Sequence, residues 1–175
     1  SAEARIRLAE ILDREGKGDE AVALLRDGLR RHRTLWGLRN SLGIAYALRG
    51  NRESAMQEFL AAQKCNENPV PRYNVYILKQ YGGLEKNRLR DMFVGLSQYD
   101  WIQERLKKGR SALKRGNREA AREEFQGVLD RYPDYAPALS NIGTYYLYSQ
   151  QMDKAVEFWN RARGIDPKQK PETSL

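Results

Sequence analysis

One stretch of this chain repeats itself at an interval of 34 residues. Shifted by that interval, LAEILDREGKGDEAVALLRDGLRRH superposes without a gap on LGIAYALRGNRESAMQEFLAAQKCN, so that Gly16 aligns with Gly50 and Leu25 with Phe59. Farther along, KGRSALKRGNREAAREEFQGVLDRYP and IGTYYLYSQQMDKAVEFWNRARGIDP superpose at the same spacing. Self-similarity at a period of 20 to 50 residues is typical of arrays in which small structural units stack on one another.

The interval between these two pairs holds one shorter unit, residues 70–101. Its pattern predicts a first helix over 72–81 and a second helix over 84–98, with a pair of glycines in the turn between them. Ile77 stands where the other units have Gly or Ala, so this third unit is degenerate.

Each unit reads as two amphipathic helices of about three turns joined by a short polar turn. A small residue in the first helix, Ala and a large apolar residue in the second, and a closing Pro recur, as in Gly109, Ala121, Phe125 and Pro133. In these features the sequence resembles the tetratricopeptide repeat family over residues 2–169. The resemblance implies an all-α fold, a right-handed α-solenoid of about five helical hairpins, which exceeds the roughly three units that a stable stacked core needs.

We therefore predict a single solenoid domain over residues 1–169 and a flexible C-terminal tail over 170–175. The repeats are expected at about 2–35, 36–69, 70–101, 102–135 and 136–169. Repeat arrays commonly cover their last apolar face with a polar capping helix, and this tail is too short for one. Self-association, a partner or further sequence is expected to cover that face.

The resemblance also implies a concave groove, lined mainly by the first helix of each repeat, that receives an extended peptide or a partner's helix. Apolar groove residues can bury partner side chains at up to about 1.5 to 3 kcal/mol each, and Asn side chains can bond a peptide backbone through both donor and acceptor. Three cations on one helical face suit an acidic partner. The predicted binding residues are Asn40, Ser41, Ile44, Leu48, Asn74, Leu78, Lys107, Arg110, Lys114, Asn141, Thr144 and Tyr148.

Two alternatives stay open at this point. Asn40 and Asn74 can equally be solvated residues of an exposed face. The chain has 31 basic and 23 acidic residues, a net charge of +8, which suits an acidic protein, nucleic acid or anionic lipid. Because cations beside aromatic rings can bind single-stranded nucleic acid, single-stranded RNA binding through the basic fourth repeat is one alternative function, and a regulatory module of a larger protein is another. Tyr76 and Trp101 are expected to pack between helices, so nucleic acid is the less favoured partner.

No sequence string typical of nucleotide-binding loops, zinc hydrolases or serine nucleophiles occurs. The one histidine, His32, and the one cysteine, Cys65, cannot build the usual metal site, acid–base pair or internal disulfide. We expect a non-enzymatic adaptor or scaffold without cofactor or metal. Glu10 and Asp13 share a helical face, which we interpret as part of a solvated charge lattice.

The chain contains no run that approaches the roughly 18 apolar residues of a membrane span. We expect a soluble protein that is cytoplasmic, or periplasmic and associated with the envelope. The family resemblance suggests a role in the assembly of an envelope, secretion or pilus complex.

Overall fold

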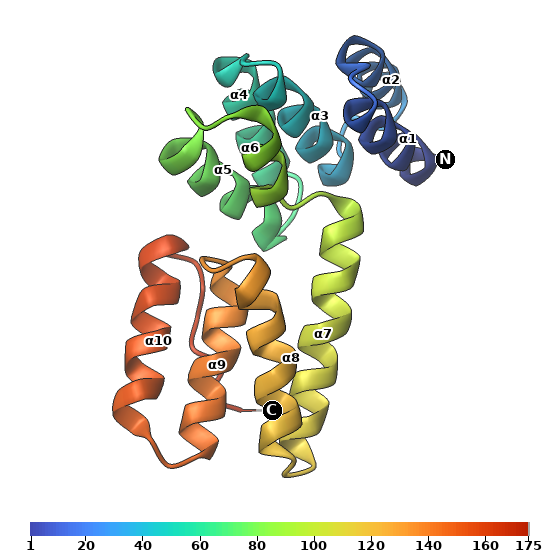
Figure 1. The fold of residues 1–175 in the computed structure, drawn as a ribbon. Coiled ribbons are helices and arrows are strands. Elements are labelled where there is room, and N and C mark those ends of the chain that lie inside the picture. The colour runs from blue at the N-terminus through green and yellow to red at the C-terminus, as the bar shows by residue number, and fades with distance from the viewer. Residues whose placement is uncertain (175) are drawn as a thin grey trace. The chain divides into compact units, whose positions relative to one another are not determined.

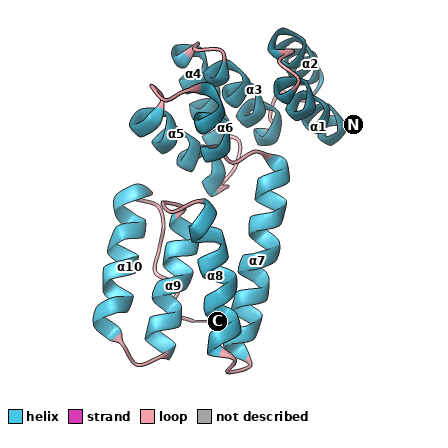
Figure 2. Cartoon of the chain, viewed as in Figure 1, coloured by secondary structure: helices cyan, strands magenta, loops and turns pink. Residues whose placement is uncertain are grey.

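The computed structural model describes residues 1–174. Ten α-helices joined by short turns make up this part of the chain, and it contains no strand (Figure 1, Figure 2). The helices group into two compact units, Ser1–Tyr99 and Asp100–Leu175. The predictions of an all-α fold and of repeated helical hairpins are confirmed.

The N-terminal unit holds three successive hairpins. Within it, the first helix of one hairpin packs against the first helix of the next, because α1 contacts α3 and α3 contacts α5. The second helix of each of the first two hairpins contacts the first helix that follows it, α2 with α3 and α4 with α5. The helices are α1 (Ala2–Arg14), α2 (Gly18–Arg31), α3 (Trp36–Leu48), α4 (Arg52–Gln63), α5 (Pro69–Tyr81) and α6 (Lys86–Met92).

The C-terminal unit holds the last two hairpins. Inside it, α8 packs on α9 and α9 packs on α10. After α10 the chain turns back and runs alongside α9 (Figure 1). The helices are α7 (Leu96–Lys114), whose first turn belongs to the N-terminal unit, α8 (Arg118–Arg131), α9 (Ala136–Tyr148) and α10 (Met152–Ile165).

In three hairpins the two helices touch where a glycine of the first faces an aromatic ring of the second. A Cβ atom placed on that glycine would overlap the ring, since real Cβ atoms do not approach other atoms within 3.0 Å. The small residue and the large apolar residue of the repeat pattern are therefore contact partners. The pairs, with the distance from the added Cβ to the nearest ring atom, are Gly43 and Phe59 (2.6 Å), Gly109 and Phe125 (2.3 Å), and Gly143 and Trp159 (2.5 Å).

The predicted second helix of the third repeat is shorter than expected. It ends at Met92, and Phe93 is extended, with φ −73° and ψ 148°. Leu96 then begins the next helix, so the prediction of one helix over 84–98 is wrong at residues 84–85 and 93–95, and residues 96–98 belong to α7 instead.

The helix breaks because the main chain beyond it finds other partners. The N–H of Val94 donates to the side-chain oxygen of Asn74 (2.9 Å), so this buried group is satisfied without a helical bond. Gly95, the next residue, costs about 1 kcal/mol in a helix interior relative to alanine. The buried ring of Phe93 packs against that of Phe59 in the preceding hairpin, with 5.6 Å between the two centroids.

The boundary between the two units, at residues 99 and 100, falls close to the predicted start of the fourth repeat at residue 102. The single solenoid domain over 1–169 and the flexibility of the tail stay predictions. Leu175, the last residue of that tail, lies outside the described residues.

Candidate functional site

The twelve predicted binding residues divide between the two units, and each unit is described by itself. In the N-terminal unit, α3 carries Asn40, Ser41, Ile44 and Leu48, and α5 carries Asn74 and Leu78. In the C-terminal unit, α7 carries Lys107, Arg110 and Lys114, and α9 carries Asn141, Thr144 and Tyr148.

The two asparagines of the N-terminal unit bind the chain's own backbone. Asn40 and Asn74 are 1% and 0% exposed, so they are not solvated surface residues. The side-chain NH₂ groups of both donate to the carbonyl of Val94, at 3.0 and 2.9 Å, and that of Asn74 also donates to Asn40 Oδ1 at 2.8 Å. The N–H of Val94 also donates to Asn74 Oδ1, so the two asparagines bind a backbone through both donor and acceptor, the mode predicted for a bound peptide. Here that backbone is the link between α6 and α7.

Three of the predicted residues line a pocket beside this link. Ser41, Ile44 and Leu48 face it from α3, whereas Leu78 is buried in the interior. The pocket is small, with a cavity volume of about 50 Å³. Its full lining is Ala9, Glu10, Asp13, Arg14, Leu25, Ser41, Ile44, Leu48, Arg90, Phe93, Gly95 and Gln98.

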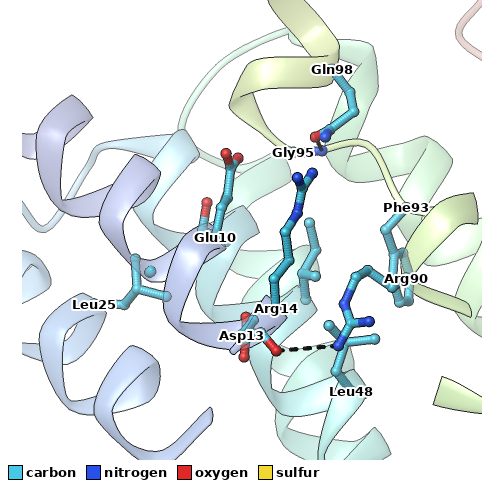
Figure 3. A pocket seen from close by; sticks show the side chains of 12 residues that line it. Glu10, Asp13, Arg14, Leu25, Leu48, Arg90, Phe93, Gly95 and Gln98 are labelled. Atoms are coloured by element: carbon cyan, nitrogen blue, oxygen red, sulfur yellow. Dashed lines mark hydrogen bonds between the residues drawn. The ribbon is translucent and has the colours of Figure 1, made fainter. Parts of the chain in front are cut away.

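Two sides of the pocket carry charge. Glu10 and Asp13 reach it from α1, and Arg90 reaches it from α6 on the other side (Figure 3). The Arg90 guanidinium donates to the main-chain carbonyl of Asp13 at 3.2 Å, the contact that Figure 3 draws as a dashed line. Ser97, in the first turn of α7, donates to Glu10 Oε2 at 2.6 Å and accepts from Arg7 at 3.1 Å. These bonds tie α1 to the segment that follows α5.

Four buried polar atoms of the pocket lining make no hydrogen bond within residues 1–174. They are Glu10 Oε1, Asp13 Oδ1, Ser41 Oγ and Arg90 Nε. Most buried polar atoms in folded proteins have a partner, because a buried group without one costs about 1 to 3 kcal/mol. Three of the four are able to accept a hydrogen bond, so the pocket is suited to a guest that donates.

Asp13 is 7% exposed, so the interpretation of a solvated charge lattice is wrong for this residue. Its burial raises the pKa of the carboxyl above the ordinary value of 3.8. The positive charges of Lys86, Arg90 and Arg49 act in the opposite direction without cancelling the effect of burial.

In the C-terminal unit, the three predicted cations share one face of α7 by their spacing of three and four residues. Lys107 and Lys114 are exposed and Arg110 is half-buried. None of the three forms an ion pair with another described residue. Their charge is therefore available to a partner.

The predicted residues of α9 lie next to the C-terminal tail. Thr144 donates to the main-chain carbonyl of Glu172, and its neighbour on the same face, Ser140, donates to that of Lys170. Asn141 donates to Pro137 O within its own helix, and its Oδ1 is buried without a hydrogen bond. Tyr148, at the end of α9, is exposed.

The aromatic side chains that precede the cations in the sequence differ in exposure. Tyr73 is buried, whereas Tyr76 and Trp101 are half-buried. The ring of Trp101 meets that of Tyr132 edge to face at 6.4 Å between centroids, and the guanidinium groups of Arg105 and Arg131 each lie 5.3 Å from its centroid. Trp101 thus packs against side chains of its own unit, as expected for a residue between helices.

Within residues 1–174 there is no group of three or more His, Cys, Asp or Glu side chains placed to hold a metal ion. No helix in this part of the chain combines the length and the apolar character needed to cross a membrane.

Sequence reasoning missed two segments of the candidate site. The link at residues 93–95 supplies Phe93 and Gly95 to the pocket, and the tail at residues 170–172 covers part of α9. For the link at residues 93–95, the signal in the sequence is Gly95, which lies inside the expected helix. For the tail at residues 170–172, the signal is Pro171, because a proline ends a helical pattern.

A family model described as Tetratricopeptide repeat matches residues 6–69 and 106–170, more than half of the chain. Among solved structures, one similar chain is YrrB, described as a TPR protein with an unusual peptide-binding site, at 22% identity over 96% of this chain and 88% of that chain, with a TM-score of 0.41. Another is MamA, at 16% identity over 99% of this chain and 97% of that chain, with a TM-score of 0.40. No match was found among curated proteins.

Proposed function

The chain belongs to the tetratricopeptide repeat family, and from that premise we propose that its N-terminal unit captures a segment of a partner protein in the pocket between α1 and α3. The fold of this family supports protein–protein interaction in general. The observation that carries the proposal is the pocket itself, with an apolar floor and four buried polar atoms that lack a hydrogen bond.

The residues that line the pocket determine which kind of partner side chain fits it. Ile44 and Leu48 offer apolar surface, while the unpartnered atoms of Glu10, Asp13 and Ser41 accept hydrogen bonds. A partner side chain with an apolar stem and a donating end satisfies both. Asn40 and Asn74 act indirectly in this proposal, because they hold the link whose residue Phe93 forms one wall.

Peptides selected from a random phage-displayed library against the full chain test the proposal. Ile44→Asp is expected to weaken their binding by roughly tenfold to a hundredfold, because a carboxylate replaces apolar surface worth about 1.5 to 3 kcal/mol. Fluorescence anisotropy of labelled peptides gives the dissociation constants.

Ile11→Asp is the matched control, since Ile11 is 52% exposed on α1 and does not line the pocket. It is expected to bind like the parent. If Ile44→Asp keeps its helical circular dichroism and binds the selected peptides as tightly as the parent, the pocket is not the capture site.

The cations of α7 support an acidic partner as a second contact. Lys107, Arg110 and Lys114 have no ion pair within residues 1–174. Tyr73 is buried and the half-buried ring of Trp101 packs against Tyr132, which disfavours the open stacking surface that single-stranded RNA needs. A role in assembling an envelope, secretion or pilus complex is the role that the family resemblance suggests, and identifying the captured protein would test it.

A further inference from the structure

The unpartnered polar atoms of the pocket between α1 and α3 are of two kinds. Arg90 Nε can only donate a hydrogen bond, whereas three atoms can accept one, namely Glu10 Oε1, Asp13 Oδ1 and Ser41 Oγ. All four atoms are buried, and the side chains of Asp13 and Ser41 belong to residues that are only 7% and 5% exposed. A guest that only donates leaves the Arg90 atom without a partner, and a guest that only accepts leaves both carboxylates without one. The guest that fits therefore carries a donor and an acceptor together.

An unpartnered donor and an unpartnered acceptor lie on two residues that touch each other. The Arg90 guanidinium donates to the main-chain carbonyl of Asp13 at 3.2 Å (Figure 3), and it also donates to Asn87 Oδ1 at 2.7 Å. Both bonds use Nη atoms, so they hold the guanidinium in place and leave Nε without a partner. A carboxamide carries its N–H and its C=O on one carbon atom, so it can donate to Asp13 and accept from Arg90 at the same time.

The charges of the pocket disfavour an ionic guest. The lining contains two carboxylates and two guanidinium groups, so its formal charge is zero. Lys86 and Arg49 add further positive charge around Asp13. A lysine or arginine side chain would bring another positive charge to these cations and would offer no acceptor to Arg90 Nε. A carboxylate would meet the like charges of Glu10 and Asp13, whereas a neutral amide meets neither difficulty.

The size of the cavity selects among the neutral polar side chains. A volume of about 50 Å³ is a few times the roughly 10 to 15 Å³ that a water molecule needs, so it takes the few atoms of an amide but not the ring of a tyrosine or tryptophan. A hydroxyl donates one hydrogen bond, whereas an amide donates two to the three acceptors. Ile44 and Leu48 offer apolar surface to methylene groups. Glutamine has two methylene groups below its amide and therefore reaches farther into the pocket than asparagine does.

We propose that the pocket is a subsite for a glutamine side chain of the captured partner, whose amide donates to Asp13 and accepts from Arg90. This proposal rests on capture of a partner by the pocket and adds the identity of the residue that is captured. The second N–H of the amide is available to the remaining acceptors, Glu10 Oε1 and Ser41 Oγ. Because glutamine and glutamate have nearly the same shape, the subsite distinguishes them by charge and hydrogen bonding alone.

The phage-selected peptides whose binding is weakened by Ile44→Asp test the proposal. They are expected to share a glutamine. Methionine in its place keeps a side chain of similar length without the hydrogen bonds, and it is expected to weaken binding about tenfold. Glutamate in its place is expected to weaken binding by more than that, because its carboxylate meets Glu10 and Asp13. Fluorescence anisotropy of labelled peptides with the full chain gives each dissociation constant, and these substitutions require no variant of the chain.

Asp13→Asn tests the role of the carboxylate through a change in preference. The new side chain can donate beside Arg90, so the variant is expected to bind the glutamate peptide at least tenfold more tightly than the parent does, and the glutamine peptide more weakly. Asp91→Asn is the matched control, since Asp91 is exposed on α6 and does not line the pocket. It makes the same change in charge and is expected to keep the parent's preference for glutamine.

The outcomes separate this proposal from capture by the pocket. If the peptides that depend on Ile44 share no glutamine, if methionine replaces it without loss, or if folded Asp13→Asn prefers glutamine to glutamate by the parent's factor, the pocket does not recognise an amide, while capture stands. If no selected peptide depends on Ile44, capture by the pocket is wrong, and the glutamine subsite is wrong with it.

Discussion

Within residues 1–174, four turns contain a residue in the left-handed region, and three of the four residues are glycines. Gly16, Gly50 and Gly116 have φ between 77° and 79°, whereas Gln150 occupies the corresponding turn with φ 58°. Left-handed backbone costs a residue with a Cβ about 1 to 2 kcal/mol, and glycine escapes that cost. Nothing lies within 4 Å of a Cβ added at the three glycines, so the preference comes from backbone strain and not from crowding.

Gln150→Gly is accordingly expected to stabilise the protein, by about 0.5 to 1 kcal/mol once the greater freedom of glycine in the unfolded chain is subtracted. Gly116→Ala is the reciprocal control and should destabilise it by about 1 kcal/mol. Urea unfolding followed by circular dichroism measures both, and a lower midpoint for Gln150→Gly would contradict the assignment of strain.

A second residue-scale effect depends on pH. Because burial raises the pKa of Asp13, the folded chain holds this proton more tightly than the unfolded chain does. Its contribution to the free energy of unfolding therefore falls as the pH rises from the ordinary value of 3.8 through the raised pKa, and then stays constant. Asp13→Asn removes this loss in the free energy of unfolding, because asparagine does not titrate.

The free energy of unfolding of Asp13→Asn, relative to the parent, should thus grow with pH across that window and level off above it. Urea titrations at a series of pH values give the difference. A difference that does not change with pH would show that the Asp13 proton is not linked to folding.

At the scale of the helix, equivalent ends of the repeats are capped unequally. The side chains of Asn51 and Asn117 accept from the N–H groups of Ser54 (3.1 Å) and Ala120 (3.2 Å) at the start of α4 and α8. Gln151 holds the same position before α10 and makes no such bond. A free helix N-terminus lacks stabilisation that an Asn cap supplies.

Gln151→Asn is therefore expected to raise the free energy of unfolding by about 1 kcal/mol, and Asn117→Ala to lower it by a similar amount. Thermal unfolding of the two variants beside the parent checks both signs. An unchanged midpoint for Gln151→Asn would mean that the backbone at this turn does not admit the capping geometry.

Local pattern predicts the elements that local contacts determine. The glycine and aromatic partners of a hairpin are 16 residues apart, as Gly43 and Phe59 are, and they recur with the repeat, so the hairpins follow from the sequence. The break after Met92 does not follow from local pattern, because it depends on hydrogen bonds to Val94 from Asn74 and Asn40, which lie 20 and 54 positions earlier. For the same reason, only some of the residues that line the pocket could be predicted from the sequence. Its α3 residues follow from the repeat, whereas Arg90 and Phe93 reach it through that break.

At the scale of the whole molecule, a net charge of +8 favours acidic partners, and three cations of α7 lack an ion pair within residues 1–174. Lys107→Glu with Lys114→Glu should weaken the binding of an acidic peptide severalfold at low salt, and the difference from the parent should shrink as salt is added, because the Debye length falls to about 8 Å at 0.15 M. Lys79→Glu with Lys168→Glu, exposed elsewhere, controls for net charge alone. Anisotropy titrations at several salt concentrations measure this, and equal losses from both double variants would remove α7 from the contact.

The hydrogen bonds from two asparagines to the link between α6 and α7 have a consequence for the dynamics of the molecule. The amide of Val94 lies outside any helix, yet its exchange with deuterated solvent requires breaking the bond to Asn74, which is itself bonded to Asn40 on α3. Opening this link thus disturbs two hairpins at once. The Val94 amide should exchange as slowly as amides in the middle of α3, whereas in ordinary surface loops exchange is among the fastest in a protein.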